Sequence, residues 1–166
     1  MVSAKVRPDV TGAGILRWPM QTPLALLPPL VLDTNIVLDL YAFEDPGTAG
    51  LRARLRAADA LWLATAAMRD ELARVLLYPA IANHLQRCER SADEVLARFD
   101  THITRVEPAP GARWRCRDAD DQKFIDLAVQ RRALLLSRDK EVLRMRKCLA
   151  PLGVQVMSRL DALSKT

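Results

Sequence analysis

Short apolar runs that end at polar residues, each followed by a helical pattern, constrain the fold of this chain more than any other feature. Leu30-Val31-Leu32 stops at Asp33, and the run from Ala133 to Leu136 continues into Ser137. Continuous apolar runs of this kind are typical of strands buried on both faces of a parallel sheet. Three further strands are predicted at residues 61–64, 103–106 and 154–156.

Amphipathic patterns fill the intervals between these strands. Met68, Leu72, Val75 and Leu76 share one helical face, and Pro79 either ends that helix or turns the chain into the next one. Other helices are predicted at residues 36–41, 48–58, 91–99, 120–131 and 142–145. Strands that alternate with helices predict an α/β fold, in which a parallel sheet carries helices on both faces.

One domain over residues 30–166 fits the length, preceded by an irregular N-terminal extension over residues 1–29. Leu24 to Leu27 loosely resembles a signal peptide, but prolines interrupt the segment and no small-x-small cleavage site follows. No apolar run is long enough to predict a membrane span. The three cysteines are widely spaced and lack CxxC pairing, which favours a reducing, cytoplasmic setting over disulfides or zinc.

The basic residues are mostly arginine, with 20 Arg against 5 Lys and a formal net charge of +5. Guanidinium groups match the geometry of phosphate, so this bias fits an anionic partner such as RNA. A codon preference for arginine explains the same bias without any partner. Both interpretations stay open at this point.

Acidic residues follow the predicted strands and open the predicted helices. Asp33 comes directly after one strand and Asp139 three residues after another, and ligands of open parallel sheets bind beyond the carboxyl ends of strands. Glu71 flanks the buried face of its helix, and Asp121, with Asp118 close by, lies on the inward side of a helix start. Each acid alone is equally well explained as a turn or cap residue.

Four converging carboxylates would be costly without a cation, because each raises the pKa of its neighbours. A set of oxygen ligands without His or Cys suits a hard divalent ion, Mg²⁺ or Mn²⁺. Such an ion lowers the pKa of a bound water and stabilises charge on an attacked phosphate, so no histidine base is required.

Four motifs, in order and at matching spacing across roughly residues 30–160, resemble the PIN-domain family, and in particular the toxins of bacterial toxin–antitoxin modules (VapC-like). They are Val31-Leu32-Asp33-Thr34-Asn35, the stretch Asp70–Leu76 followed by Pro79, the stretch Cys116–Ile125, and Ser137-Arg138-Asp139-Lys140. The resemblance implies a three-layer α/β/α sandwich with a mostly parallel five-stranded sheet. It also implies a metal-dependent endoribonuclease that is held in check by an antitoxin and is often a homodimer.

Carried over to this sequence, the family's catalytic and metal-binding acids would be Asp33, Glu71, Asp121 and Asp139, with Asp118 as a further metal ligand. Asn35 and Ser137 would orient ligands or water. Candidate substrate contacts are Arg138 and Lys140 beside the last acid, together with Arg113 and Arg115. Trp114, between the last two, either stacks on a base or fills the core.

The sequence departs from the family pattern where many relatives carry glycine, before the last acidic strand and near its acid. Here Gln130-Arg131-Arg132-Ala133 and Arg138 stand instead, and Arg138 either grips phosphate or pairs with a carboxylate. Helices around Leu51, Leu55 and Leu85 are predicted contacts for a protein partner.

Three other functions were compared with the nuclease. A phosphatase of the haloacid dehalogenase type needs an Asp where Asn35 stands, and a dinucleotide-binding domain needs a glycine-rich turn after the first strand. Neither requirement is met. The serious alternative is a PIN-like module that binds RNA or protein without cutting, and loss of metal binding would favour it.

Overall fold

The structure, a computed structural model, describes residues 9–11, 15–17 and 27–160. Within the N-terminal extension, β1 (Asp9–Thr11) pairs with β2 (Ile15–Arg17) in antiparallel fashion. The rest of residues 1–26, and with it most of the predicted extension and the segment that resembles a signal peptide, lies outside the described residues.

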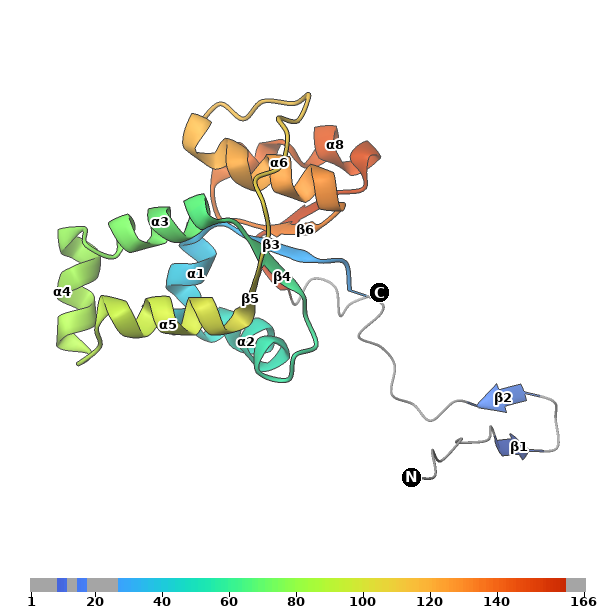
Figure 1. Ribbon diagram of the computed structural model, residues 1–166, viewed down its shortest axis with the longest axis horizontal. Coiled ribbons are helices and arrows are strands. Elements are labelled where there is room, and N and C mark those ends of the chain that lie inside the picture. Colours follow the sequence, from blue (N-terminus) through green and yellow to red (C-terminus); the bar gives the residue numbers. More distant parts are fainter. Residues whose placement is uncertain (1–8, 12–14, 18–26, 161–166) are drawn as a thin grey trace.

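The main sheet has five parallel strands in the order β5-β4-β3-β6-β7 (Figure 1). The strands are β3 (Leu30–Leu32), β4 (Trp62–Ala64), β5 (Ile103–Arg105), β6 (Leu134–Leu136) and β7 (Gln155–Met157). All four pairings are parallel. The predicted five-stranded α/β fold is therefore confirmed, and the sheet is parallel throughout rather than mostly so.

Burial of the strands follows their composition. Every residue of β3, β4 and β6 is buried, as expected for central strands covered on both faces. The edge strand β5 is partly exposed, and its last residue is Arg105. The three apolar triplets thus occupy the middle of the sheet and fix which strand ends lie at its centre.

Helices cover both faces of the sheet, with α6 and α8 on one side and α1, α2 and α5 on the other (Figure 1). The α-helices are α1 (Thr34–Tyr41), α2 (Ala49–Arg56), α3 (Ala66–Val75), α4 (Pro79–Arg87), α5 (Ala92–His102), α6 (Gln122–Arg131), α7 (Lys140–Arg144) and α8 (Arg146–Leu149). Single 3-10 turns are η1 (Pro46–Thr48), η2 (Ala119–Asp121) and η3 (Ala150–Leu152).

Local signals account for most helix boundaries. The Thr65 and Ser91 side chains cap α3 and α5. Pro79 lies in the first turn of α4, where its missing N–H costs nothing. It therefore turns the chain into the next helix, the second of the two roles predicted for it.

Leu51, Leu55 and Leu85 are all buried, and the prediction that they form an exposed partner surface is wrong.

The C-terminal end of α6 has an unusual backbone conformation. Arg132 caps this helix in the left-handed region, with φ at 48°. Glycine adopts this conformation without steric cost, whereas a residue with a Cβ does so at a penalty. In the turn over residues 130–133, where glycine was expected from the family pattern, an arginine therefore adopts a conformation that favours glycine.

None of the helices in the described part of the chain has the length and apolar character needed to cross a bilayer.

Candidate active site

Asp33 and Asp139 lie at the carboxyl ends of the two central strands. β3 and β6 are neighbours in the sheet, and the backbone N–H of Asp33 donates to the carbonyl of Leu136 at 2.9 Å. The chain leaves β3 toward β4 on one side, while β6 and β7 lie on the other, so the strand order reverses between β3 and β6. This switch point is where open α/β sheets place their ligands.

Asp33 is buried, with 4% of its surface exposed, and Ser137 holds its carboxylate in place. The Ser137 hydroxyl donates to Asp33 Oδ2 at 2.6 Å, and the Asn35 amide donates to the same oxygen at 3.4 Å. Burial raises the pKa of Asp33, the hydrogen bond from Ser137 opposes that rise, and the charge of Glu71 adds to it. Ser137 and Asn35 thus orient this acid through the contacts expected of supporting residues.

Glu71 reaches the same region from α3. Its Oε2 accepts a hydrogen bond from the Thr34 hydroxyl at 3.0 Å, and the Lys123 ammonium lies 3.0 Å from the same oxygen. The Glu71 side chain is 14% exposed. Its charge is therefore met by one cation of the chain itself, Lys123, to which the sequence analysis had given no role.

Asp121 is the most perturbed acid of the group. Its pKa is raised to about 7, mainly by burial and then by the charges of Asp33, Asp139, Asp118 and Glu71. Its Oδ2 is buried and has no hydrogen-bond partner. A buried carboxylate oxygen without a partner is rare in folded proteins and points to a missing ligand such as an ion. Contacts made by Thr34, Lys123 and Ser137 join Glu71, Asp33, Asp139 and the turn before α6 in one region of the fold.

Asp118 and Asp139 sit at the border of this cluster, where both act as caps. Asp118 Oδ1 accepts from the N–H of Asp120 at 2.9 Å, and Asp139 Oδ1 accepts from the N–H of Glu141 at 2.7 Å. Asp118 is exposed, whereas Asp121 is buried at the centre. Between these two alternatives for the third acidic position, the structure therefore places Asp121 in the interior.

The donor set fits a hard divalent ion, although the side chains are not closed around one. In the part of the chain that the structure describes, no three acidic, His or Cys side chains are arranged to hold a metal ion. The chemistry nevertheless suits Mg²⁺ or Mn²⁺, because the donors are carboxylate oxygens that repel one another and one of them lacks any partner. The donor atoms are therefore of the right type for such an ion, but the side chains are not arranged in a coordination sphere.

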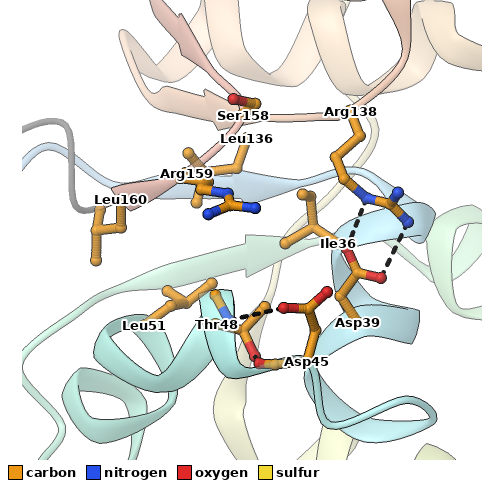
Figure 2. A pocket seen from close by; sticks show the side chains of 11 residues that line it. Ile36, Asp39, Asp45, Thr48, Leu51, Leu136, Arg138, Ser158, Arg159 and Leu160 are labelled. Atoms are coloured by element: carbon orange, nitrogen blue, oxygen red, sulfur yellow. Dashed lines mark hydrogen bonds and ion pairs between the residues drawn. The ribbon is translucent and has the colours of Figure 1, made fainter.

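The predicted substrate contacts are spread around the cluster. Arg138 forms a two-pronged ion pair with Asp39 of α1, with N–O distances of 2.6 and 2.9 Å (Figure 2). Lys140 is exposed at the first turn of α7. Arg113 and Arg115 are exposed on the loop between β5 and η2. For Arg138 the open alternative of pairing with a carboxylate is observed, and its partner is not one of the cluster acids.

A small pocket is lined by residues of α1, η1, α2 and the segment after β7 (Figure 2). Asp39, Arg138 and Arg159 line it together with Leu51 and Leu136, but none of the five cluster acids does. Its polar rim is already internally paired through Asp39 and Arg138. The pocket therefore adds no chemistry to the acidic site.

Two residues of the site were missed by sequence analysis. Lys123, two residues after Asp121, could have been noticed in the sequence. A basic residue in the first turn of a helix is unfavourable with the helix dipole, which suggests that a nearby acid holds it there. Thr34 is an ordinary turn residue by sequence, and only the fold brings it to Glu71, 37 positions away.

The comparisons with known proteins place this geometry in a family. None of the curated proteins compared with the chain matches it. Residues 29–141, which include all five cluster acids, match the PIN domain. PIN domains are generally nucleases, and their catalysis usually depends on divalent metals. The chain belongs to the PIN-domain family.

Proposed function

We propose that this chain is a metal-dependent endoribonuclease that hydrolyses RNA phosphodiester bonds at the acidic cluster. The observation that carries the proposal is Asp121, a buried carboxylate with an unpartnered oxygen, whose pKa is raised mainly by burial and further by the charges of four neighbouring acids. A cluster of this kind costs stability in the apo protein and is explained by the cation that it would bind. Membership of a family of nucleases supports the same chemistry.

In this proposal Asp33, Glu71, Asp121 and Asp139 hold the ion, with Asp118 as a further ligand at the border of the cluster. When bound, a divalent ion supplies a water of lowered pKa and a positive charge opposite the phosphate. Ser137 fixes the orientation of Asp33 through its short hydrogen bond, so that this carboxylate loses little freedom on binding. Lys123 holds Glu71 near the cluster from the outer side.

The experiment is cleavage of a mixed cellular RNA pool by the purified chain with Mg²⁺, Mn²⁺ or EDTA. Asp33→Asn removes one charge and keeps the shape that Ser137 contacts, so we expect metal-dependent cleavage to fall at least ~100-fold. Asp59→Asn, in the exposed loop before β4, is the matched control and keeps full activity. Cleavage that persists in EDTA or in Asp33→Asn would reject the proposed chemistry.

A second function is favoured by a specific observation. No three donors in the described residues are arranged for a metal, and Glu71 already has Lys123 as a cation. A PIN fold that binds RNA or protein without cutting fits both facts. Calorimetric titration with Mn²⁺ separates the two functions, because the binding module takes up no ion at concentrations that saturate the nuclease.

We further propose that the nuclease is the toxin of a toxin–antitoxin pair, active as a homodimer in the cytoplasm. This part is supported by the likeness of the four motifs to VapC-like toxins. Induced expression in a bacterial host should arrest growth, and Asp33→Asn should not. Growth that continues at full rate while the expressed chain cuts RNA in extracts would exclude the toxin role and leave the nuclease intact. Sedimentation of the purified chain tests the dimer.

A further inference from the structure

An exposed tryptophan lies on the loop that leads into the acidic site. Trp114 has 40% of its surface exposed, on the segment between β5 and η2. The Arg113 guanidinium lies 5.6 Å from the centre of its ring, and Arg115 and Arg117 are exposed beside it. Of the two alternatives for Trp114, the core position is therefore excluded. A large part of the indole is therefore open to a ligand, with arginines next to it in the chain on both sides.

The loop is fixed to α6 by two polar side chains. Gln122 donates to the carbonyl of Trp114 at 3.0 Å and accepts from the N–H of Cys116 at 2.6 Å. Asp126 accepts from the N–H of Ala112 at 2.8 Å and from the Gln122 amide at 2.7 Å. Figure 1 shows the loop running along α6 after it leaves β5. The exposed ring is thus presented by a clamped backbone.

The clamp also places the loop next to the acidic cluster. Gln122 directly follows Asp121, the acid at the centre of the cluster. The N–H of Cys116 donates to the Gln122 side chain at 2.6 Å, so the loop is tied to the residue next to this acid. Trp114 is two residues from Cys116. A strand bound at the acids therefore has the indole within a few nucleotides' reach.

We propose that Trp114 stacks on an unpaired base of the RNA while Arg113, Arg115 and Arg117 contact the adjoining phosphates. The proposal rests on the function proposed above and names the residues of this chain that hold the RNA beside the acidic site. Aromatic rings stack on every kind of base, and arginines supply the charge that phosphates require. Bases within a duplex are already stacked, and proteins contact such RNA mainly through its backbone.

The test measures binding in EDTA, where no cleavage confounds it. A labelled single-stranded RNA of 12 nucleotides and the corresponding duplex are titrated with wild type, Trp114→Phe and Trp114→Ala, and anisotropy is followed. We expect Trp114→Ala to weaken single-strand binding roughly 5- to 100-fold, and Trp114→Phe to weaken it less, since stacking contributes on this scale. Duplex binding should change less than twofold. Tyr78→Ala, another exposed aromatic away from the loop, is the matched control.

Tryptophan fluorescence gives an independent measure of the contact. Emission present in wild type and absent in Trp114→Phe belongs to Trp114, and it should be quenched by the single strand and not by the duplex. Unchanged melting temperatures show that the variants are folded.

Equal single-strand affinity of Trp114→Ala and wild type would overturn the proposal, and so would equal losses for single strand and duplex. Wild type that binds no RNA would also overturn it. If Trp114-dependent binding is found but nothing is cut with metal, the stacking site stands and the nuclease proposal falls. If the chain cuts RNA and Trp114→Ala does not change single-strand binding, the nuclease proposal stands and the stacking proposal falls.

Discussion

Lys123 is the residue that most changes how the acidic cluster is understood. Its ammonium lies 3.0 Å from Glu71 Oε2, and its side chain is 27% exposed. The same ammonium donates to the carbonyl of Asp120, which ties it to the turn before α6. A lysine held in this way competes with a metal ion for Glu71 and lowers the negative charge of the whole cluster. In the proposed nuclease, the metal affinity of the site would therefore depend on this cation as well as on the five acids.

Replacing Lys123 should consequently strengthen metal binding. Lys123→Gln removes the competing charge, and we expect the Kd for Mn²⁺ to fall roughly three- to tenfold, the range that a nearby unit charge produces. Lys123→Arg should stay near wild type, and Lys147→Gln, on the far helix α8, is the control. Calorimetry or Mn²⁺ electron paramagnetic resonance measures the affinity without RNA. Weaker binding in Lys123→Gln would mean that the lysine organises the acids instead of competing for one.

A second residue-level device is the pair of Asp39 and Arg138. Figure 2 shows the two side chains facing each other. The Asp39 side chain is 8% exposed and that of Arg138 is 54% exposed. When the pair is broken, water can therefore solvate the arginine but not the carboxylate. Arg138→Gln leaves a buried carboxylate without its partner, whereas Asp39→Asn leaves an arginine that water can reach. We expect the first change to lower the free energy of unfolding by about 1–3 kcal/mol and the second by less.

Urea denaturation of both single variants and of the double variant measures this asymmetry, since contacting residues are not additive. RNA binding by Asp39→Asn adds a test of Arg138 as a substrate contact. Affinity that is kept or raised when Arg138 is freed supports a phosphate contact. Arg138→Gln with unchanged RNA affinity shows that the arginine serves the fold alone.

At the scale of elements, the end of α6 stores strain that a single substitution should release. Arg132 holds φ at 48°, in a conformation that costs a non-glycine residue roughly 1–2 kcal/mol. Glycine loses more chain entropy on folding, about 0.5–1 kcal/mol, and the Arg132 methylenes that lie against Gly153 would be lost. We expect Arg132→Gly to raise the free energy of unfolding by about 0.5–1 kcal/mol.

Arg131→Gly is the matched control, because Arg131 is the last residue inside α6. There glycine should cost about 1 kcal/mol, so the two neighbouring substitutions are expected to change stability in opposite directions. Thermal or urea denaturation distinguishes them. If both destabilise, the packing of Arg132 on Gly153 outweighs its backbone strain.

The elements show which parts of the molecule sequence can predict. Apolar triplets locate β3, β4 and β6, because strands buried on both faces leave a direct mark on composition. The place of Asp33 can be predicted in the same way, since an acid directly after such a strand must lie at the carboxyl end of the sheet. Glu71 and Asp121 follow from helical periodicity, which says which side of a helix faces inward.

Side-chain contacts between residues far apart in the sequence leave no such mark on composition. Arg138 and Asp39 are 99 positions apart, and their contact depends on β6 lying next to β3. The exposure of Trp114 depends on the clamp by Gln122, a residue with no motif of its own. Composition indicated that a basic, aromatic loop was there, and only the fold shows that its ring faces water.

At the scale of the whole molecule, the acidic cluster should make stability depend on pH and on metal together. The pKa of Asp121 is raised from 3.8 to about 7, and those of Asp33 and Asp39 are raised as well. Exposed Glu44 and Asp100 have lowered pKa values, which act in the opposite direction but are worth little in solvent. The net effect is therefore set by the buried acids.

An acid whose pKa is raised by folding holds its proton more tightly in the folded state than in the unfolded state. Stability is then greatest below the unfolded pKa, near 4, and is lost as the pH rises through the folded pKa, near 7 for Asp121. In EDTA we expect the free energy of unfolding to fall by about 2–4 kcal/mol between pH 5 and pH 8. Asp121→Asn should remove most of this slope, and Asp59→Asn should leave it unchanged.

A divalent ion should reverse the loss, because it replaces the proton as the partner of the cluster. Mn²⁺ is therefore expected to raise the melting temperature strongly at pH 8 and weakly at pH 5, where protons compete for the same oxygens. The Mn²⁺ effect should disappear in Asp33→Asn. A flat pH profile in EDTA would show that the carboxylates stand further apart in solution than in the structure. A steep profile without any response to Mn²⁺ would show that the acids meet but hold no ion, and the chain would then be a binding module with the fold of a nuclease.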